Sequence, residues 1–386
     1  MLRSTDRILV SHAGTLPRPE DVARVFNDGT DDELKQMLPD AVRDVVHKQA
    51  ELGIDIVNDG EFSKRGGFSG YVRNRISGIQ QRQVPAGEGP RAHDVTARDR
   101  HEFPGAFAAG VGPFRGGGTA NQPYFCVGRL EYIGKANVEN DIANLKAACA
   151  GQNVEPYLPA IAPGTVEHWL WNEHYPDQES FLFAIADALH EEYKAITDAG
   201  VLLQIDDPDL PDGWQMDPSM SVAKYREYAD LRVAAINRAL EGIPEDRVRL
   251  HICWGSGHGP HKNDIPLRDI ADIVLKVRAQ CYSVEAANPM HQYEWHVWED
   301  VKLPEGKVLI PGVIAHTTAV VEHPETVAER LTNFARVVGR ERVMAGADCG
   351  FAQGAMYQRQ HPTVMWAKFE ALVQGARLAS ERLWRS

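Results

Sequence analysis

Short apolar runs alternate with segments of helical period along most of the chain. One amphipathic stripe consists of Ile185, Leu189, Tyr193 and Ile196, and Gly200 ends it. The strand-like runs are short and apolar nearly throughout, which is typical of parallel strands that helices cover on both faces. The predicted strands are residues 8–11, 54–58, 156–161, 201–205, 248–253, 282–286, 308–314 and 343–347.

These repeated strand–helix units predict an α/β protein with a (β/α)8 TIM barrel, formed by residues 1–386 as a single domain. An open doubly wound sheet is the alternative, but no Gly-x-Gly-x-x-Gly turn follows the first strand. A long insertion, residues 81–135, is expected after the second βα unit. Its first part is rich in Gly and Pro, and residues 124–127 and 130–133 are expected to pair as a hairpin.

Candidate metal ligands stand at the ends of several predicted strands, which is where barrel enzymes place their chemistry. His251 and Cys253 share one face of a strand because side chains alternate, and Cys349 and Glu285 end two other strands. Imidazole, two thiolates and a carboxylate suit tetrahedral Zn²⁺. The alternative for each residue alone is a buried core position. Cys281 shares a face with Glu285 and is the alternative fourth ligand.

Other titratable groups surround the same predicted barrel mouth. Glu61 and Asp206, each beside a second carboxylate, are candidates for contact with a substrate ammonium or hydroxyl, although acidic residues at such positions often cap helices. His316 follows the strand at 308–314 and is the candidate proton donor, because imidazole titrates near neutral pH. A structural histidine is the alternative there.

Composition narrows the class of protein. The 386 residues carry a formal charge of −13, which argues against nucleic acid as a partner. No run approaches about 20 consecutive apolar residues and the N-terminus has no signal-peptide pattern, so we expect no membrane partner. Five scattered cysteines do not form a disulfide framework, so a reducing cytoplasm is expected. Whether the chain forms a homo-oligomer stays open.

In chain order, these positions resemble the catalytic half of the cobalamin-independent methionine synthases. The similarity begins at Ser-His-Ala-Gly-Thr-Leu-Pro-Arg-Pro over residues 11–19 and continues through Asp-Gly-Glu at 59–61 and Gln-Ile-Asp-Asp-Pro at 204–208. It ends with His-Ile-Cys at 251–253, Glu285, His316 and Asp-Cys-Gly at 348–350. The loop at 253–260 is more similar to a single-barrel branch that includes the epoxyalkane:coenzyme M transferases.

The resemblance implies a role for each residue. It implies that Thr15 lies at the amino-acid carboxylate site, that Glu61 and Asp206 hold the homocysteine ammonium, and that His316 donates a proton. The implied zinc ligands are His251, Cys253, Glu285 and Cys349.

We therefore expect a zinc-dependent transferase that moves a methyl or alkyl group from a donor onto a small-molecule thiol, with homocysteine as the first candidate. An epoxyalkane:coenzyme M transferase is the alternative, and its sulfonate would favour basic residues such as Arg18, Lys64 or Arg65. A decarboxylase of the uroporphyrinogen type and a zinc-binding protein without turnover are more distant alternatives.

Overall fold

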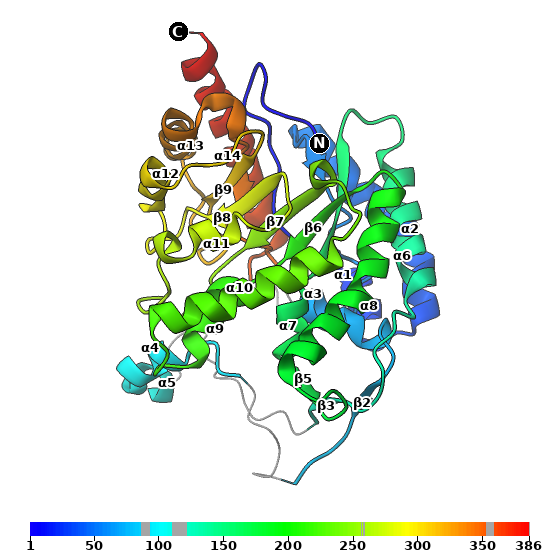
Figure 1. Ribbon diagram of the computed structural model, residues 1–386. Helices are drawn as coiled ribbons and strands as arrows, with labels where there is room; N and C mark the ends of the chain where they lie inside the picture. The colour runs from blue at the N-terminus through cyan, green and yellow to red at the C-terminus, as the bar shows by residue number, and fades with distance from the viewer. Residues whose placement is uncertain (86–92, 110–121, 256, 258, 353–358, 386) are drawn as a thin grey trace.

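A curled parallel sheet forms the centre of the computed structural model, which describes residues 1–85, 93–109, 122–255, 257, 259–352 and 359–385 (Figure 1). Its order is β1-β4-β6-β7-β8-β9-β10, and all neighbouring strands run parallel. The strands are β1 Ile56–Val57, β4 Glu155–Ile161, β6 Leu202–Asp206, β7 Val248–Ile252, β8 Cys281–Glu285, β9 Val308–Ile314 and β10 Gly346–Ala347.

The first predicted strand lies between the two edges of this sheet. Val10 forms a parallel bridge with Ala345, next to β10, and its carbonyl accepts a hydrogen bond from Ile56 of β1 at 3.2 Å. The Asp55 carboxylate accepts the Val10 N–H at 2.8 Å, so a side chain replaces one partner of a regular strand ladder. These contacts join the edges of the curled sheet and are consistent with the predicted (β/α)8 barrel.

Helices cover the outside of the sheet, and the apolar core lies between the two layers (Figure 1). In α2, Thr30 and Glu33 form a capping box at the first turn, and Gly53 ends the helix with a φ of 93°. The helices are α1 Glu20–Asp28, α2 Asp31–Leu52, α3 Gly67–Gly70, α4 Ala97–Glu102, α5 Pro104–Ala109, α6 Lys135–Cys149, α7 Pro163–Glu167, α8 Gln178–Asp198, α9 Asp209–Met216, α10 Val222–Ala239, α11 Ala271–Val274, α12 Val297–Asp300, α13 Pro324–Val338 and α14 Pro362–Trp384. Across the described residues, no helix has the length and apolar character needed to cross a bilayer.

A second, three-stranded sheet has the order β2-β3-β5, with β2 Ile79–Gln81, β3 Tyr124–Cys126 and β5 Leu170–Asn172. The predicted hairpin between residues 124–127 and 130–133 is wrong, because β3 pairs antiparallel with β2 and Tyr132 bridges Ile76 instead. Gly78 permits this pairing, since a Cβ there would lie 2.6 Å from the carbonyl oxygens of Gly128 and Arg129. Residues 116–118, three consecutive glycines in the Gly-rich part of the insertion, fall outside the described residues.

Candidate metal centre and substrate cavity

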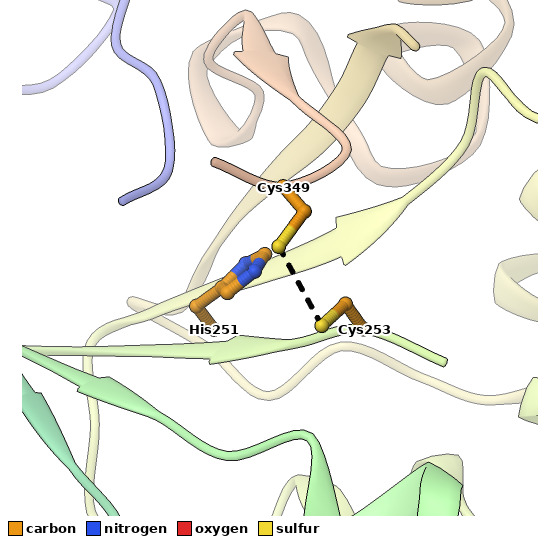
Figure 2. Close-up of side chains that lie close together, drawn as sticks. All are labelled: His251, Cys253 and Cys349. Carbon is orange, nitrogen blue, oxygen red and sulfur yellow. Dashed lines mark hydrogen bonds between the residues drawn. The ribbon is translucent and has the colours of Figure 1, made fainter. Parts of the chain in front are cut away.

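The ends of β7 and β10 bring three ligand-type side chains together. His251 lies near the end of β7, Cys253 follows that strand, and Cys349 follows β10. One ligand atom from each residue lies within 4.8 Å of the other two, and all three side chains are buried (Figure 2). The strand parity that predicted a shared face for His251 and Cys253 therefore corresponds to a compact three-residue group.

This group fits a zinc ion by the chemistry of its donors. His251 Nδ1 lies 3.1 Å from Ser283 Oγ, which orients the ring. The buried ring also interacts with the Cys349 thiol, so the imidazole and that sulfur already form one polar group. One imidazole and two sulfurs are a donor set that Zn²⁺ prefers.

The two cysteine sulfurs lie 3.7 Å apart (Figure 2). Their hydrogen bond holds the pKa of Cys349 well below its usual range, and His251 lowers it further. The same bond, with burial, raises the pKa of Cys253 well above its usual range. The contact therefore favours ionisation of Cys349 over that of Cys253, and thiolate is the form that binds metal.

Glu285 ends β8, as predicted, but lies outside the three-residue group. Its Oε1 accepts the Trp254 N–H at 3.2 Å, and its Oε2 accepts from the Asn288 amide. Burial, with the charge of Asp348, raises its pKa well above the usual value. Cys281, the alternative ligand, starts the same strand, and its Sγ contacts Met1 Sδ in a small core cluster.

His316 follows β9 and is fully buried. It is close enough to Cys349 to contribute electrostatically to the low pKa of that thiol. Its carbonyl accepts a hydrogen bond from Gln360 at 3.0 Å, which ties the loop after β9 to the segment before α14. The predicted proton donor thus stands on the metal side of the site.

A cavity of about 360 Å³ is lined by all three of these side chains. The predicted substrate-binding residues Thr15, Glu61 and Asp206 line it together with His251, Cys253 and Cys349. Neither Glu285 nor His316 is among the described residues that line this cavity. Six of the eight predicted site residues therefore face one space, although they come from distant parts of the sequence.

Glu61 and Asp206 form what we call the acidic corner of the cavity, and neighbouring side chains hold Glu61 in place. Thr15 Oγ1 donates to Glu61 Oε1 at 2.9 Å, and Lys64 Nζ lies 3.0 Å from Glu61 Oε2. Glu61 has a φ of 57°, a left-handed conformation that is rare outside glycine and is found at functional sites. Burial and the nearby Glu61 raise the pKa of Asp206 to about 7.

The three basic residues named above as suited to a sulfonate already pair with protein oxygens, and Arg359 is a basic residue that does line the cavity. Arg18 donates to the carbonyls of Glu61 and Phe62, and Lys64 pairs with Glu61. Arg65 donates to backbone carbonyls between α1 and α2. None of these three basic residues is among the described residues that line the cavity.

Sequence analysis missed the part of the cavity wall that comes from the insertion. Val95, Thr96 and Asp99 of the insertion line the cavity, together with Trp169, a candidate aromatic platform from the sequence. Arg98 anchors α4 through Trp214. It donates a hydrogen bond to the Trp214 carbonyl at 2.6 Å, and its guanidinium carbon lies 3.4 Å from the centre of the Trp214 ring. These partners are more than a hundred residues apart in sequence, so no local pattern signals the contact.

Comparison with known proteins then supplies the family. The family described as "Cobalamin-independent synthase, Catalytic domain" matches residues 160–367, more than half of the chain. The chain belongs to this family. That assignment confirms the resemblance on which the expected site roles rest.

Relatives and a solved structure agree with this assignment. The methionine synthase of Saccharolobus solfataricus is 24% identical over 382 residues, covering 96% of this chain and 95% of the relative. The methionine synthase of Pyrococcus furiosus is 24% identical and covers 87% and 84%. A B12-independent methionine synthase from Shewanella sp. W3-18-1, solved in complex with selenomethionine, shares the fold with a TM-score of 0.72. It is 21% identical, and the match covers 98% of this chain and 100% of that one. Family membership and relatives together support a methyltransferase of the methionine-synthase type.

Proposed function

We propose that this protein is a zinc-dependent transferase that moves a methyl group onto the thiol of homocysteine. The observation that carries the proposal is the shared cavity, in which a His–Cys–Cys group faces two carboxylates. A thiol bound at the first would place the ammonium of the same amino acid at the second. This matches an amino acid with a terminal thiol better than a thiol without an amine.

His251, Cys253 and Cys349 would hold the metal, with Glu285 as the exchangeable fourth ligand. Zinc bound there supplies a Lewis acid that lowers the pKa of a substrate thiol, so that the nucleophilic thiolate prevails at neutral pH. When the substrate thiol replaces Glu285 as a ligand, the carboxylate would keep its hydrogen bonds to Trp254 and Asn288, which supports this ligand exchange.

The other residues position the substrate and move a proton. Asp206 and Glu61 bind the ammonium, and the Thr15 segment receives the carboxylate. Lys64 contacts Glu61 and orients that carboxylate. His316, through a water molecule, donates a proton to the leaving atom of the alkyl donor, since its place beside Cys349 brings it to the reacting sulfur's side of the site.

The charge of the cavity favours homocysteine over coenzyme M. Carboxylates line the corner where a sulfonate would have to bind, whereas Arg18, Lys64 and Arg65 already pair with protein oxygens. Moving a sulfonate beside Asp206 would place two negative charges in a buried space, which is costly.

Calorimetric titration of the zinc-loaded protein with each thiol tests the proposal. We expect homocysteine to bind and coenzyme M to bind at least about tenfold more weakly. The zinc-loaded protein should also transfer a methyl group to homocysteine from at least one donor in a screen. Tighter binding of coenzyme M, or no transfer from any donor, would overturn it.

A further inference from the structure

Only two lysines are buried among the residues that the structure describes, Lys64 and Lys368. Lys64 belongs to the acidic corner, where it pairs with Glu61. Lys368 lies in α14, is fully buried, and contacts the loop that follows β9. That loop begins near His316, the proton donor of the proposed function, which gives Lys368 no role.

The Lys368 ammonium finds all of its acceptors on this loop. Its Nζ donates to the Val320 carbonyl at 2.5 Å. It also lies 3.1 Å from Oε1 and 2.9 Å from Oε2 of Glu322. An ammonium has three N–H donors, so the set of acceptors is complete. Lys368 thereby fixes the loop at two points.

Glu322 carries this constraint to the backbone at His316. Its Oε1 also accepts the Ala315 N–H at 2.8 Å, so the side chain closes the loop onto the residue before the histidine. After the histidine, the Gln360 amide donates to the His316 carbonyl at 3.0 Å. Gln360 stands just before α14, and Lys368 lies within that helix. The backbone before and after the His316 side chain is thus held by the same part of the chain.

Stability alone does not account for a buried Lys368–Glu322 pair. Burial lowers the pKa of Lys368, although Glu322 opposes that effect. Taking two charges out of water is costly, and an apolar pair of similar size often stabilises a protein as well or better. What an ion pair adds is a single geometry, because separating its partners would leave each charge unpaired in the interior. The position of the loop is therefore what this pair specifies.

The position of His316 matters because its side chain is fully buried. It is also not among the described residues that line the cavity. A general acid must stand within hydrogen-bond reach of the atom or the water molecule that it protonates. Since a displacement of about 1 Å can cost about 100-fold in rate, a loop that drifts would impair the reaction.

We propose that Lys368 is a positioning residue, which acts through Glu322 on the backbone at His316 and so sets the delivery of the proton. The proposal rests on the proposed function and deepens it. In that reaction the homocysteine sulfur forms a bond to the methyl carbon, and the bond from this carbon to the donor atom breaks. The donor atom keeps the bonding pair and takes a proton from His316. Lys368 therefore affects only the step that needs this proton.

Two methyl donors separate this role from the rest of the site. The nitrogen that leaves 5-methyltetrahydrofolate takes up a proton, whereas the iodide that leaves methyl iodide takes none. With zinc-loaded protein and saturating homocysteine, Lys368→Met should lower kcat for 5-methyltetrahydrofolate at least about tenfold. The KM for homocysteine and the protein-dependent rate with methyl iodide should each stay within about twofold of the wild type.

A double-mutant cycle shows whether Lys368 acts through His316. In a His316→Asn background, Lys368→Met should change kcat for 5-methyltetrahydrofolate less than about twofold, because the group that it positions is already gone. Lys368→Arg keeps the positive charge and should recover part of the loss. Lys276→Met is the control, because it removes a lysine from an exposed pair with Asp230 and should match the wild type.

A further variant keeps the test informative if Lys368→Met does not fold. Lys368→Met combined with Glu322→Gln leaves no unpaired charge and retains an acceptor for the Ala315 N–H, so this double variant should fold and bind zinc. It should still lower kcat for 5-methyltetrahydrofolate, because the loop has lost its bonds to the ammonium.

An unchanged kcat for 5-methyltetrahydrofolate in Lys368→Met, or in the double variant, would overturn the proposal. A loss that persists in full in the His316→Asn background, or that appears equally with methyl iodide, would overturn it too. So would a wild type that uses methyl iodide but not 5-methyltetrahydrofolate. Failure of the proposed function looks different, because the wild type would then methylate homocysteine with neither donor.

Discussion

The two sides of the cavity are built in different ways. On the metal side, His251, Cys253 and Cys349 project from neighbouring parts of one sheet, where ladder hydrogen bonds set the spacing. On the far side, α4 and the loop after Cys253 are held by hydrogen bonds of single side chains such as Arg98 and Asp99. Val95 there is 38% exposed, whereas Cys253 is 4% exposed. The sheet therefore fixes the positions of the three ligand-type side chains, while the far side consists of segments that can change without disturbing them.

The largest effect is expected on the metal side. Cys253→Ser and Cys349→Ser should each lose most bound zinc and lower methyl transfer more than about 100-fold, because even residues behind a metal ligand cost 10- to 100-fold. The fold should persist, since the sheet does not depend on the metal. Zinc analysis and circular dichroism check both points. Cys149→Ser, at a half-buried cysteine of α6, is the matched control, and full zinc content in both ligand variants would refute the assignment.

The second-largest effect is expected at Glu61 and Asp206, the acidic corner of the cavity. Asp206→Asn should weaken homocysteine binding about 30-fold, because a hydrogen bond to a charged group contributes about 2 kcal/mol. Zinc content should stay unchanged, which separates the corner from the metal centre. Calorimetry measures the dissociation constant, and Asp198→Asn on the surface of α8 serves as the control. Equal affinity for homocysteine in Asp206→Asn and the wild type would exclude the ammonium contact.

A smaller effect should follow from loosening the far wall. Arg98→Ala removes the hydrogen bonds that dock α4 and should raise the KM for the donor about threefold to tenfold. Homocysteine affinity should remain within twofold. Arg129→Ala, at an exposed arginine, is the control. If Arg98→Ala weakened the binding of homocysteine and the binding of the donor equally, the two sides of the cavity would not be independent.

The last effect is on stability rather than on binding, and it concerns the junction between the two sides, where Trp254 stacks on His291. Burial would lower the pKa of His291, but its bonds to Asp264 and Glu294 raise it to about 9. A pKa raised by folding gives stability that is complete below 6.5 and is lost as the pH rises through 9. The free energy of unfolding should therefore fall by about 1 kcal/mol per pH unit in this window. Urea denaturation at several pH values measures this slope. A slope in His291→Gln equal to that of the wild type would show that His291 is not its cause.

Sequence patterns predicted the metal side far better than the far side. Strand parity places His251 and Cys253 on one face, and position at a strand end brings in Cys349. The same rules place Glu285 at the end of β8, but they say nothing of the hydrogen bonds that hold its carboxylate away. The hairpin at residues 124–133 was wrong because the close approach at Gly78 is a long-range contact. Sequence patterns also did not predict that α4 lines the cavity, because the contacts that dock it are distant in sequence.

Zinc K-edge X-ray absorption on the purified protein, with and without homocysteine, tests the central claim most directly. We predict one nitrogen, two sulfur and one oxygen neighbour in the free protein, and replacement of the oxygen by a third sulfur when homocysteine is added. An unchanged spectrum on addition of homocysteine, or an active protein without zinc, would contradict it.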